Sequence, residues 1–275
     1  CRQAEGRRPE GCIRMDPKRR KLPALGGPFD PEPGSGVIEK MPRPTREKRG
    51  LLVKAFVSWS GGKDCMLACH RAMRRPETEI AFLLNMLTEK GECSLSHQLP
   101  AELLKSQAQA LGIPILQRKA SRTEYEKEFK QAIAYLKRQG VEAGVFGDID
   151  LEAHRSWLER VCREMDIQAI FPLWDDKRET MLEEFINAGF KSRIVVTDAA
   201  VMGDDWLGCE IDRGFMEKIK ALPHIDACGE KGEYHTFVYD GPMFRTPVSF
   251  SDEGHLMIEK HWVLKLGVGI RSGIF

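Results

Sequence analysis

Residues 51–65 read LLVKAFVSWSGGKDC, and this stretch decides the fold that we expect. Its first part, from Leu51 to Trp59, is apolar and rich in bulky residues, which favours a buried β-strand. A short glycine turn follows, and apolar residues then recur at helical spacing from Asp64 to Arg75. A strand that passes through a glycine turn directly into a helix is the repeating unit of α/β proteins.

The same alternation continues as far as residue 173. Apolar runs typical of buried strands alternate with amphipathic segments whose apolar residues repeat with helical period. This pattern favours a parallel sheet covered by helices on both faces, with ligands at the carboxyl ends of the strands. We expect strands at 51–59, 80–87, 113–117, 143–146 and 169–173, and helices at 64–75, 101–111, 123–139 and 157–165.

The pattern becomes less regular after about Asp175, which predicts a second, smaller domain of mixed α/β structure. Helices are expected at 177–188 and 213–221, a strand at 192–197, and β-hairpin structure within 245–270. The expected division is a tail at 1–50, a first α/β domain at 51–174, a second domain at 175–250 and a C-terminal β extension at 251–275.

The tail differs from the rest in composition. Residues 1–50 hold eight of the 15 prolines and 13 basic against seven acidic residues, which is typical of a disordered segment. A nucleic-acid-binding arm is the alternative interpretation. Met41 lies shortly before the first expected strand, and we expect the folded protein to begin near it.

The charge and the cysteine content of the chain disfavour several classes of function. The whole chain has a formal net charge of +1, so no global field favours nucleic acid or a membrane surface. No apolar run reaches the roughly 18 to 20 residues of a membrane helix, and no signal-peptide pattern is present. The eight cysteines include no CxxC pair, so we expect reduced cysteines in a cytoplasmic protein.

The turn after the first expected strand carries the groups of an anion site. Glycines let the backbone approach a phosphate closely, while serine hydroxyls, free amides and the helix N-terminus attract it. Lys63 offers an ammonium for a phosphoryl oxygen, and Asp64 can cap the helix or help to hold Mg²⁺. The expected phosphate contacts are Ser58, Ser60, Gly61, Gly62, Lys63 and Asp64.

The turn lacks the GxxxxGK[ST] pattern of a Walker loop. It resembles instead the PP-loop, SGGxD[ST], of the ATP pyrophosphatase family, in which the loop holds the pyrophosphate that leaves when a substrate is adenylylated. Cys65 stands where that pattern has serine or threonine. The thiol is either a small group packed under the loop or a nucleophile activated at a helix N-terminus, and we favour the packed group.

Further candidate residues follow other expected strands. Residues 228–237 read CGEKGEYHTF, a glycine turn with two carboxylates that could bind a cation, an ammonium group or an amine, or could be a solvated hairpin. Asp148 follows a strand and a glycine, which suits a contact to adenine, ribose or substrate. His97 also lies after a strand, and the alternative is a surface-loop histidine.

The order of these motifs resembles the diphthine–ammonia ligase family. The resemblance spans about Leu51 to Pro247 and implies a HUP-type, Rossmann-like ATP-binding domain followed by a smaller domain. It further implies an ATP- and Mg²⁺-dependent ligase that adenylylates a carboxylate, forms an amide with ammonia and releases AMP and pyrophosphate. The motifs are SGGKD at 60–64, GDI at 147–149, WLERVC at 157–162, PLW at 172–174, WLG at 206–208 and GEKGEYHTFVYDGP at 229–242.

Site residues follow from the resemblance together with the turn chemistry. The expected catalytic residues are Lys63, Asp64, Glu230 and Glu233, with Asp64 also expected to bind Mg²⁺. The expected ATP contacts are the six loop residues and Asp148. The expected substrate contacts are His97, Gly229, Glu230, Gly232, Glu233, His235 and Thr236.

The glycine turn departs from the family at two positions. Archaeal and eukaryotic members resemble EGGEYET there, whereas Lys231 here stands for a glycine and His235 for a glutamate. The pattern is closer to that of a bacterial branch linked to cobamide salvage, so the sequence does not identify which carboxylate is the substrate.

The alternatives are a PP-loop pyrophosphatase or amidohydrolase-type enzyme of cobamide salvage, a tRNA-thiolase-like enzyme, and a non-catalytic nucleotide-binding module. The acidic excess of residues 51–275, 34 against 29 basic, disfavours the thiolase. We expect no membrane or nucleic-acid partner, and leave homo-oligomer formation open.

Overall fold

Five strands form a parallel sheet in the order β3-β2-β1-β4-β5. The computed structural model describes residues 52–222 and 224–269. The segment 1–50, for which we predicted disorder, lies outside the described residues. The strands are β1 (Val53–Ser58), β2 (Thr78–Leu87), β3 (Ile115–Lys119), β4 (Ala143–Val145) and β5 (Gln168–Ile170).

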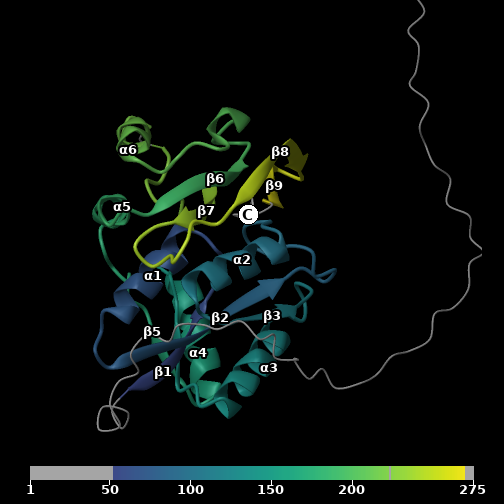
Figure 1. The fold of residues 1–275 in the computed structure, drawn as a ribbon, viewed down its shortest axis with the longest axis vertical. Coiled ribbons are helices and arrows are strands. Elements are labelled where there is room, and N and C mark those ends of the chain that lie inside the picture. Colours follow the sequence, from purple (N-terminus) through teal and green to yellow (C-terminus); the bar gives the residue numbers. More distant parts are fainter. Residues whose placement is uncertain (1–51, 223, 270–275) are drawn as a thin grey trace, which may run out of the picture. The chain divides into compact units, whose positions relative to one another are not determined.

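Helices cover both faces of this sheet, as predicted (Figure 1). Alternate residues of β1 point to opposite sides: Ala55 and Val57 pack with α1 and α2, whereas Phe56 packs with α3 and α4. The strand order reverses between β1 and β4, and in such sheets the crevice at the carboxyl ends of those strands binds ligands. The helices are α1 (Lys63–Met73), α2 (Ala101–Leu111), α3 (Tyr125–Arg138) and α4 (Glu152–Glu164).

Helix α4 begins at Glu152, earlier than the predicted start at Trp157. Its first turn is exposed and polar, so it carries none of the apolar periodicity from which we predicted the helix. The extra turn brings His154 onto the helix, within reach of the residues that follow β4.

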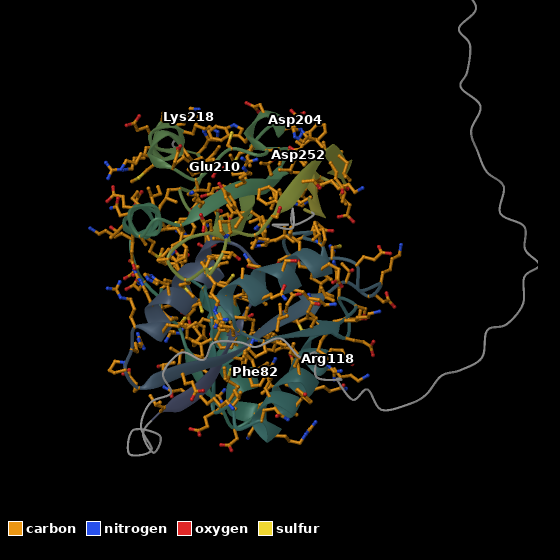
Figure 2. All side chains as sticks on the ribbon, in the orientation of Figure 1. Phe82, Arg118, Asp204, Glu210, Lys218 and Asp252 are labelled. Atoms are coloured by element: carbon orange, nitrogen blue, oxygen red, sulfur yellow. The ribbon has the colours of Figure 1, made fainter. Side chains whose placement is uncertain are left out.

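A second sheet is antiparallel, in the order β7-β6-β9-β8. The predicted hairpin is confirmed as β8 and β9, and β9 also pairs with β6, so this sheet crosses the boundary that we expected at residue 250. Exposed polar side chains such as Asp204, Lys218 and Asp252 lie on this part of the chain (Figure 2). The elements are α5 (Arg178–Asn187), β6 (Lys191–Asp198), η2 (Asp204–Trp206), α6 (Arg213–Lys220), β7 (Tyr234–Asp240), β8 (Phe250–Ile258) and β9 (His261–Val268).

One hydrophobic cluster joins the two sheets. It includes Val57 of β1 and Leu103 of α2 together with Ile194 of β6 and Phe237 of β7, all fully or almost fully buried. Strand β7 therefore lies beside the turn between β1 and α1, where the amide of Val238 donates to the carbonyl of Gly61 at 3.0 Å. No helix in the described part of the chain is both long and apolar enough to cross a membrane.

Candidate active site

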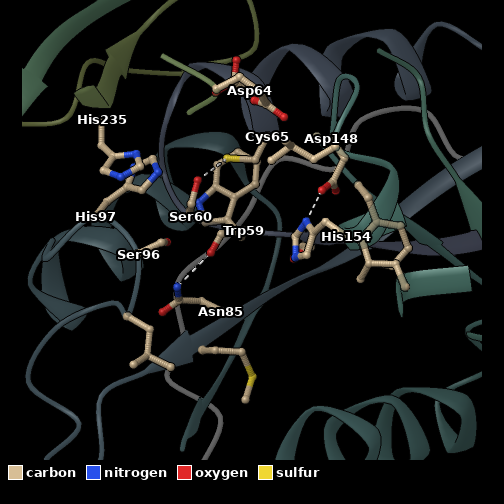
Figure 3. Close-up of a pocket in the computed structure, with 18 of the residues that line it drawn as sticks. Trp59, Ser60, Asp64, Cys65, Asn85, Ser96, His97, Asp148, His154 and His235 are labelled. Carbon is tan, nitrogen blue, oxygen red and sulfur yellow. Dashed lines mark hydrogen bonds and ion pairs between the residues drawn. The ribbon is translucent and has the colours of Figure 1, made fainter. Parts of the chain in front are cut away.

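A cavity of about 650 Å³ opens at the carboxyl edge of the parallel sheet (Figure 3). Its wall is built from the turn after β1, the end of β2, the loop after β4, the first turns of α4 and the glycine turn before β7. Of the sequence-predicted residues, those that line it are Ser58, Ser60, Lys63, Asp64, His97, Asp148, Gly229, Glu230, His235 and Thr236.

Two glycines let the turn take its shape. Gly61 has a φ of +87°, a left-handed conformation that glycine adopts without strain, and a β-carbon there would lie 2.5 Å from Leu104. Gly62 precedes α1, and a β-carbon there would lie 2.3 Å from Cε1 of His97. The second glycine of the SGGKD motif thus makes room for the histidine side chain.

Gln107 of α2 holds the turn after β1 in place through hydrogen bonds. Its side chain is fully buried, its Oε1 accepts from the indole of Trp59 at 2.7 Å, and its Nε2 donates to the carbonyls of Gly61 at 3.0 Å and Val238 at 2.6 Å. One side chain therefore links α2, the turn and β7. An amide buried inside an otherwise apolar helix face was the sequence signal for this role, and our sequence analysis missed it.

The turn presents hydrogen-bond donors at a helix N-terminus. The Lys63 amide donates to Oγ1 of Thr236 at 3.0 Å, so a residue of β7 occupies one of the donors. Within the described residues the amide of Asp64 donates to no other group, whereas the amide of Gly61 donates to the Cys65 thiol. The free Asp64 amide and the positive end of the α1 dipole suit an anion, and phosphate binding at this turn stays the prediction made from the sequence.

Lys63 lines the cavity, but its ammonium is held by other groups of the protein. Its ammonium donates to both oxygens of Asp64, at 2.9 and 2.8 Å, and to the carbonyl of Cys228, and it lies 5.2 Å from the ring centre of Tyr234. Burial alone would lower the pKa of Lys63, but the Asp64 carboxylate together with Tyr234 and Cys228 outweighs it, and the pKa is raised. The ammonium is therefore held charged beside the turn, where it joins α1 to the glycine turn.

Cys65 is packed beneath the turn. Its thiol donates to the carbonyl of Gly62 at 3.2 Å and accepts from the Ser60 hydroxyl at 3.4 Å. Burial, the largest effect, raises the pKa of this thiol, and the helix N-terminus does not reverse the shift. Of the two interpretations of Cys65, this environment suits the packed small residue and not an activated nucleophile.

Glu230 reaches the cavity from the glycine turn. Its Oε1 accepts from the amide of Ile149 at 3.4 Å, which ties the turn to the loop after β4. Burial, together with the nearby Asp64 carboxylate, raises the pKa of Glu230 to about 7. A carboxyl group with such a pKa can both accept and release a proton near neutral pH.

Asp148 has a partner that the sequence analysis did not single out. Oδ1 of Asp148 contacts Nδ1 of His154, one helical turn into α4 (Figure 3), and this contact raises the pKa of His154. The His154 ring also stacks on Trp157, with ring centres 5.9 Å apart. Single histidines without a spacing pattern give no sequence signal, so only the fold brings this residue to the site.

Asn85 is a second residue that the sequence analysis missed. It is buried within β2, donates to the carbonyl of Trp59 at 2.8 Å and lines the cavity. A lone polar residue in the run IAFLLNML was the available signal, because a buried amide needs hydrogen-bond partners.

His97 and His235 meet in the cavity wall, although the expected alternative for His97 was a surface loop. Their rings stack with centres 4.6 Å apart and planes inclined by 26°. Nδ1 of His97 lies 2.9 Å from the carbonyl oxygen of Thr236. Burial, the largest effect on both rings, lowers the pKa of His97 to about 4 and that of His235 to about 3.

Glu233 lies inside the glycine turn and does not line the cavity. Its two carboxylate oxygens accept from the amides of Asp226 and Lys231, each at 3.0 Å, and the side chain is 5% exposed. Gly232, with a φ of +89°, also lies away from the cavity lining. These contacts suit holding the turn in shape, whereas direct catalysis by Glu233 stays a prediction.

No group of three or more His, Cys, Asp and Glu side chains within residues 52–222 and 224–269 could hold a metal ion by itself. Mg²⁺, however, usually binds one or two carboxylates together with phosphate oxygens of the substrate. Asp64 is a third exposed and stands beside the anion-binding amides, so it fits that mode of binding.

Known families match both parts of the chain. Residues 53–169 match the diphthamide synthase N-terminal domain, and residues 177–271 match the diphthamide synthase C-terminal domain. The two matches fall on the parallel and antiparallel sheets in turn. The chain therefore belongs to the diphthamide synthase family, as the sequence motifs led us to expect.

Curated relatives are distant in sequence. Proteins named diphthine–ammonia ligase from Homo sapiens and Bos taurus are each 24% identical over 216 residues, which cover 69% of this chain and 79% of theirs. One from Saccharomyces cerevisiae is 23% identical and is covered over 33% of its length. A solved "predicted subunit of tRNA methyltransferase" from Methanocaldococcus jannaschii matches with a TM-score of 0.37 and 17% identity, over 71% of this chain and 100% of that one.

Proposed function

We propose that this protein is an ATP-dependent ligase that activates a carboxylate as an acyl-adenylate and joins it to ammonia. The observation that carries the proposal is the SGGKD turn at the N-terminus of α1, which faces a cavity that also contains Glu230. Relatives are named diphthine–ammonia ligases, so the carboxylate of diphthine is the first candidate substrate.

The turn would hold the phosphates of ATP. The amide of Asp64 and the dipole of α1 would contact phosphoryl oxygens, while Mg²⁺ at Asp64 would neutralise further charge. Mg²⁺ supplies electrostatic stabilisation of the departing pyrophosphate when bound.

The first chemical step is an attack of the substrate carboxylate on the α-phosphorus. A new bond joins the carboxylate oxygen to this phosphorus as the bond to the bridging oxygen of the β-phosphate breaks, and pyrophosphate leaves. Lys63 stands charged beside the turn and would stabilise the negative charge of the leaving group through its field.

Ammonia then attacks the acyl carbon, and AMP leaves with the electrons of the acyl–oxygen bond. The attacking nitrogen must lose a proton, and Glu230 is the group with the pKa to accept it near neutral pH. Asp64 and Asp148 are less suited to this role, because each is already paired with a basic side chain.

Product analysis tests the proposal. The protein with Mg-ATP, ammonium and a diphthine-bearing acceptor is expected to release AMP and pyrophosphate in equal amounts, and a Lys63→Ala variant to be at least tenfold slower. An exposed Lys105→Ala variant on α2 is the matched control and should keep the wild-type rate. Release of ADP and phosphate would refute the mechanism, and full activity of Lys63→Ala would remove this side chain from the chemistry.

A further inference from the structure

His97 and His235 form a stacked pair that the catalytic steps above do not use. His97 comes from the loop before α2 and is 8% exposed, whereas His235 belongs to β7. Figure 3 shows the two rings side by side at the edge of the cavity, which residues of both sheets line. Two imidazoles in contact, both largely buried, are uncommon unless neither carries a charge.

The hydrogen bond of His97 fixes its tautomer. A carbonyl oxygen can only accept, so Nδ1 of His97 carries the hydrogen that points to Thr236 at 2.9 Å. Its Nε2 is then a bare lone-pair acceptor. Because burial keeps the pKa of His97 near 4, this nitrogen stays an acceptor at neutral pH.

Within the described residues, neither Nε2 of His97 nor either ring nitrogen of His235 has a hydrogen-bond partner. None of these three nitrogen atoms is shut off from solvent. Both residues line the cavity. Neutral His235 has one ring nitrogen with a hydrogen and one with a lone pair. The wall therefore offers two lone pairs, that of Nε2 of His97 and one on His235, and a ligand that fills both must bring two hydrogen-bond donors.

We propose that His97 and His235 together form the subsite that binds ammonia. That the ligand is ammonia rests on the proposed ligase function. The requirement for a small hydrogen-bond donor rests on the geometry of the two rings alone. Two acceptors about 3 Å from one nitrogen, at a tetrahedral angle, lie about 5 Å apart. The ring centres are 4.6 Å apart, and ring nitrogens on the same side of the stack would have about that separation, so one ammonia molecule could donate to both rings and keep its lone pair for the acyl carbon.

Local charge favours neutral ammonia over the ammonium ion. Lys63 lowers the pKa of both histidines and His261 lowers that of His235, while Asp64 acts in the opposite direction on His235. The one carboxylate that acts on the pKa of His235, Asp64, is bound to the Lys63 ammonium and is therefore not free to pair with a cation. An ammonium ion would bind here only after releasing a proton.

Nitrogen NMR of ring-labelled histidine in the full-length protein tests the subsite without any carboxylate substrate. Ammonium chloride is expected to shift Nε2 of His97 and one ring nitrogen of His235, more strongly near pH 9 than near pH 7, because free ammonia increases with pH. Potassium chloride at equal ionic strength is the cation control, and the exposed His224 is the internal control. A His235→Phe variant keeps a stacked ring but removes one acceptor, so the shift at His97 should weaken at least several-fold.

An equal shift with potassium chloride would show a cation site and overturn the proposal, and so would an ammonium response that is stronger near pH 7 or unchanged in His235→Phe. Pyrophosphate release is measured separately. If the protein cleaves ATP but the histidines do not respond, the subsite is wrong and the ligase function stands. If the histidines respond but no pyrophosphate appears, the subsite stands and the ligase function fails.

Discussion

At the scale of single residues, three carboxyl groups line one cavity, and the fold gives each a different partner. Asp64 binds the ammonium of Lys63, and Asp148 contacts His154. Glu230 has only the amide of Ile149, so burial and the two nearby carboxylates outweigh Lys63 and raise its pKa to about 7. Of the three carboxyl groups, Glu230 is therefore the one suited to exchange protons near neutral pH.

Glu230 makes the first prediction, which concerns stability. Its folded-state pKa lies above its ordinary value of 4.5, so the native protein binds the proton more tightly than the unfolded chain does. Its contribution to stability is complete below about pH 4.5 and is lost as the pH rises through about 7. A Glu230→Gln variant should therefore gain stability relative to wild type between pH 5 and pH 8 in urea denaturation. A constant difference between the two proteins across that range would contradict the raised pKa.

Cys65 makes the second prediction. A Cys65→Ser variant should keep pyrophosphate release within a few-fold of wild type, because serine can make the same contacts with Ser60 and the carbonyl of Gly62. Iodoacetamide at pH 7 should modify the half-buried Cys93 well before Cys65, as judged by peptide mass spectrometry. Loss of all activity in the serine variant together with rapid alkylation of Cys65 would support the nucleophile instead.

At the scale of elements, α2 and β7 hold the turn between β1 and α1 from two sides. Gln107 reaches from α2, and Thr236 and Val238 reach from β7. The anion site therefore depends on an element that is distant in sequence.

Helix α2 makes the third prediction. Gln107→Leu leaves the buried indole N–H of Trp59 without its acceptor and removes one donor from each of the carbonyls of Gly61 and Val238. Because the carbonyl of Gly61 keeps the amide of Val238 and an unpaired buried group costs about 1–3 kcal/mol, the free energy of unfolding should fall by at least about 1 kcal/mol. Gln109→Leu, at an exposed position of the same helix, is the matched control and should change little. Equal stabilities of the two variants in denaturant titration would show that Gln107 does not support the turn.

The sequence predicted local units better than the contacts between them. The strand, glycine turn and helix at 51–75 were predictable because the apolar period and the glycines lie within one short segment. The contact of Gln107 with Gly61, the pair of Asp148 with His154, and the contacts of the Lys63 ammonium were not. Each depends on how separate elements pack, and neither spacing nor residue type encodes that packing.

At the scale of the whole molecule, the two sheets share one core. The cluster that includes Val57 and Leu103 also includes Ile194 and Phe237, so one face of the parallel sheet and the antiparallel sheet bury their apolar side chains together. The family matches divide the chain into two domains at about residues 169–177, whereas the packing joins them. The change of pattern near Asp175 suggested a division of the chain, but no pattern in the sequence indicated the shared core.

The shared core makes the fourth prediction. Amides in the central strands β1 and β6 should exchange hydrogen with the same opening free energy, because both open only when the common core is lost. Hydrogen-exchange mass spectrometry on peptides that contain each strand measures this. If the β6 peptide exchanges through a separate opening of clearly lower free energy, the second sheet is an independent folding unit.

The central claim is that ATP is cleaved between its α and β phosphates at the turn after β1. Two ATP analogues test it most directly, in the presence of Mg²⁺, ammonium and a diphthine-bearing acceptor, with amide formation measured by mass spectrometry. The β,γ-imido analogue keeps a cleavable α–β bond and is predicted to support amide formation, whereas the α,β-methylene analogue is predicted to support none and to compete with ATP. Amide formation with the α,β-methylene analogue but not with the β,γ-imido analogue would contradict the account.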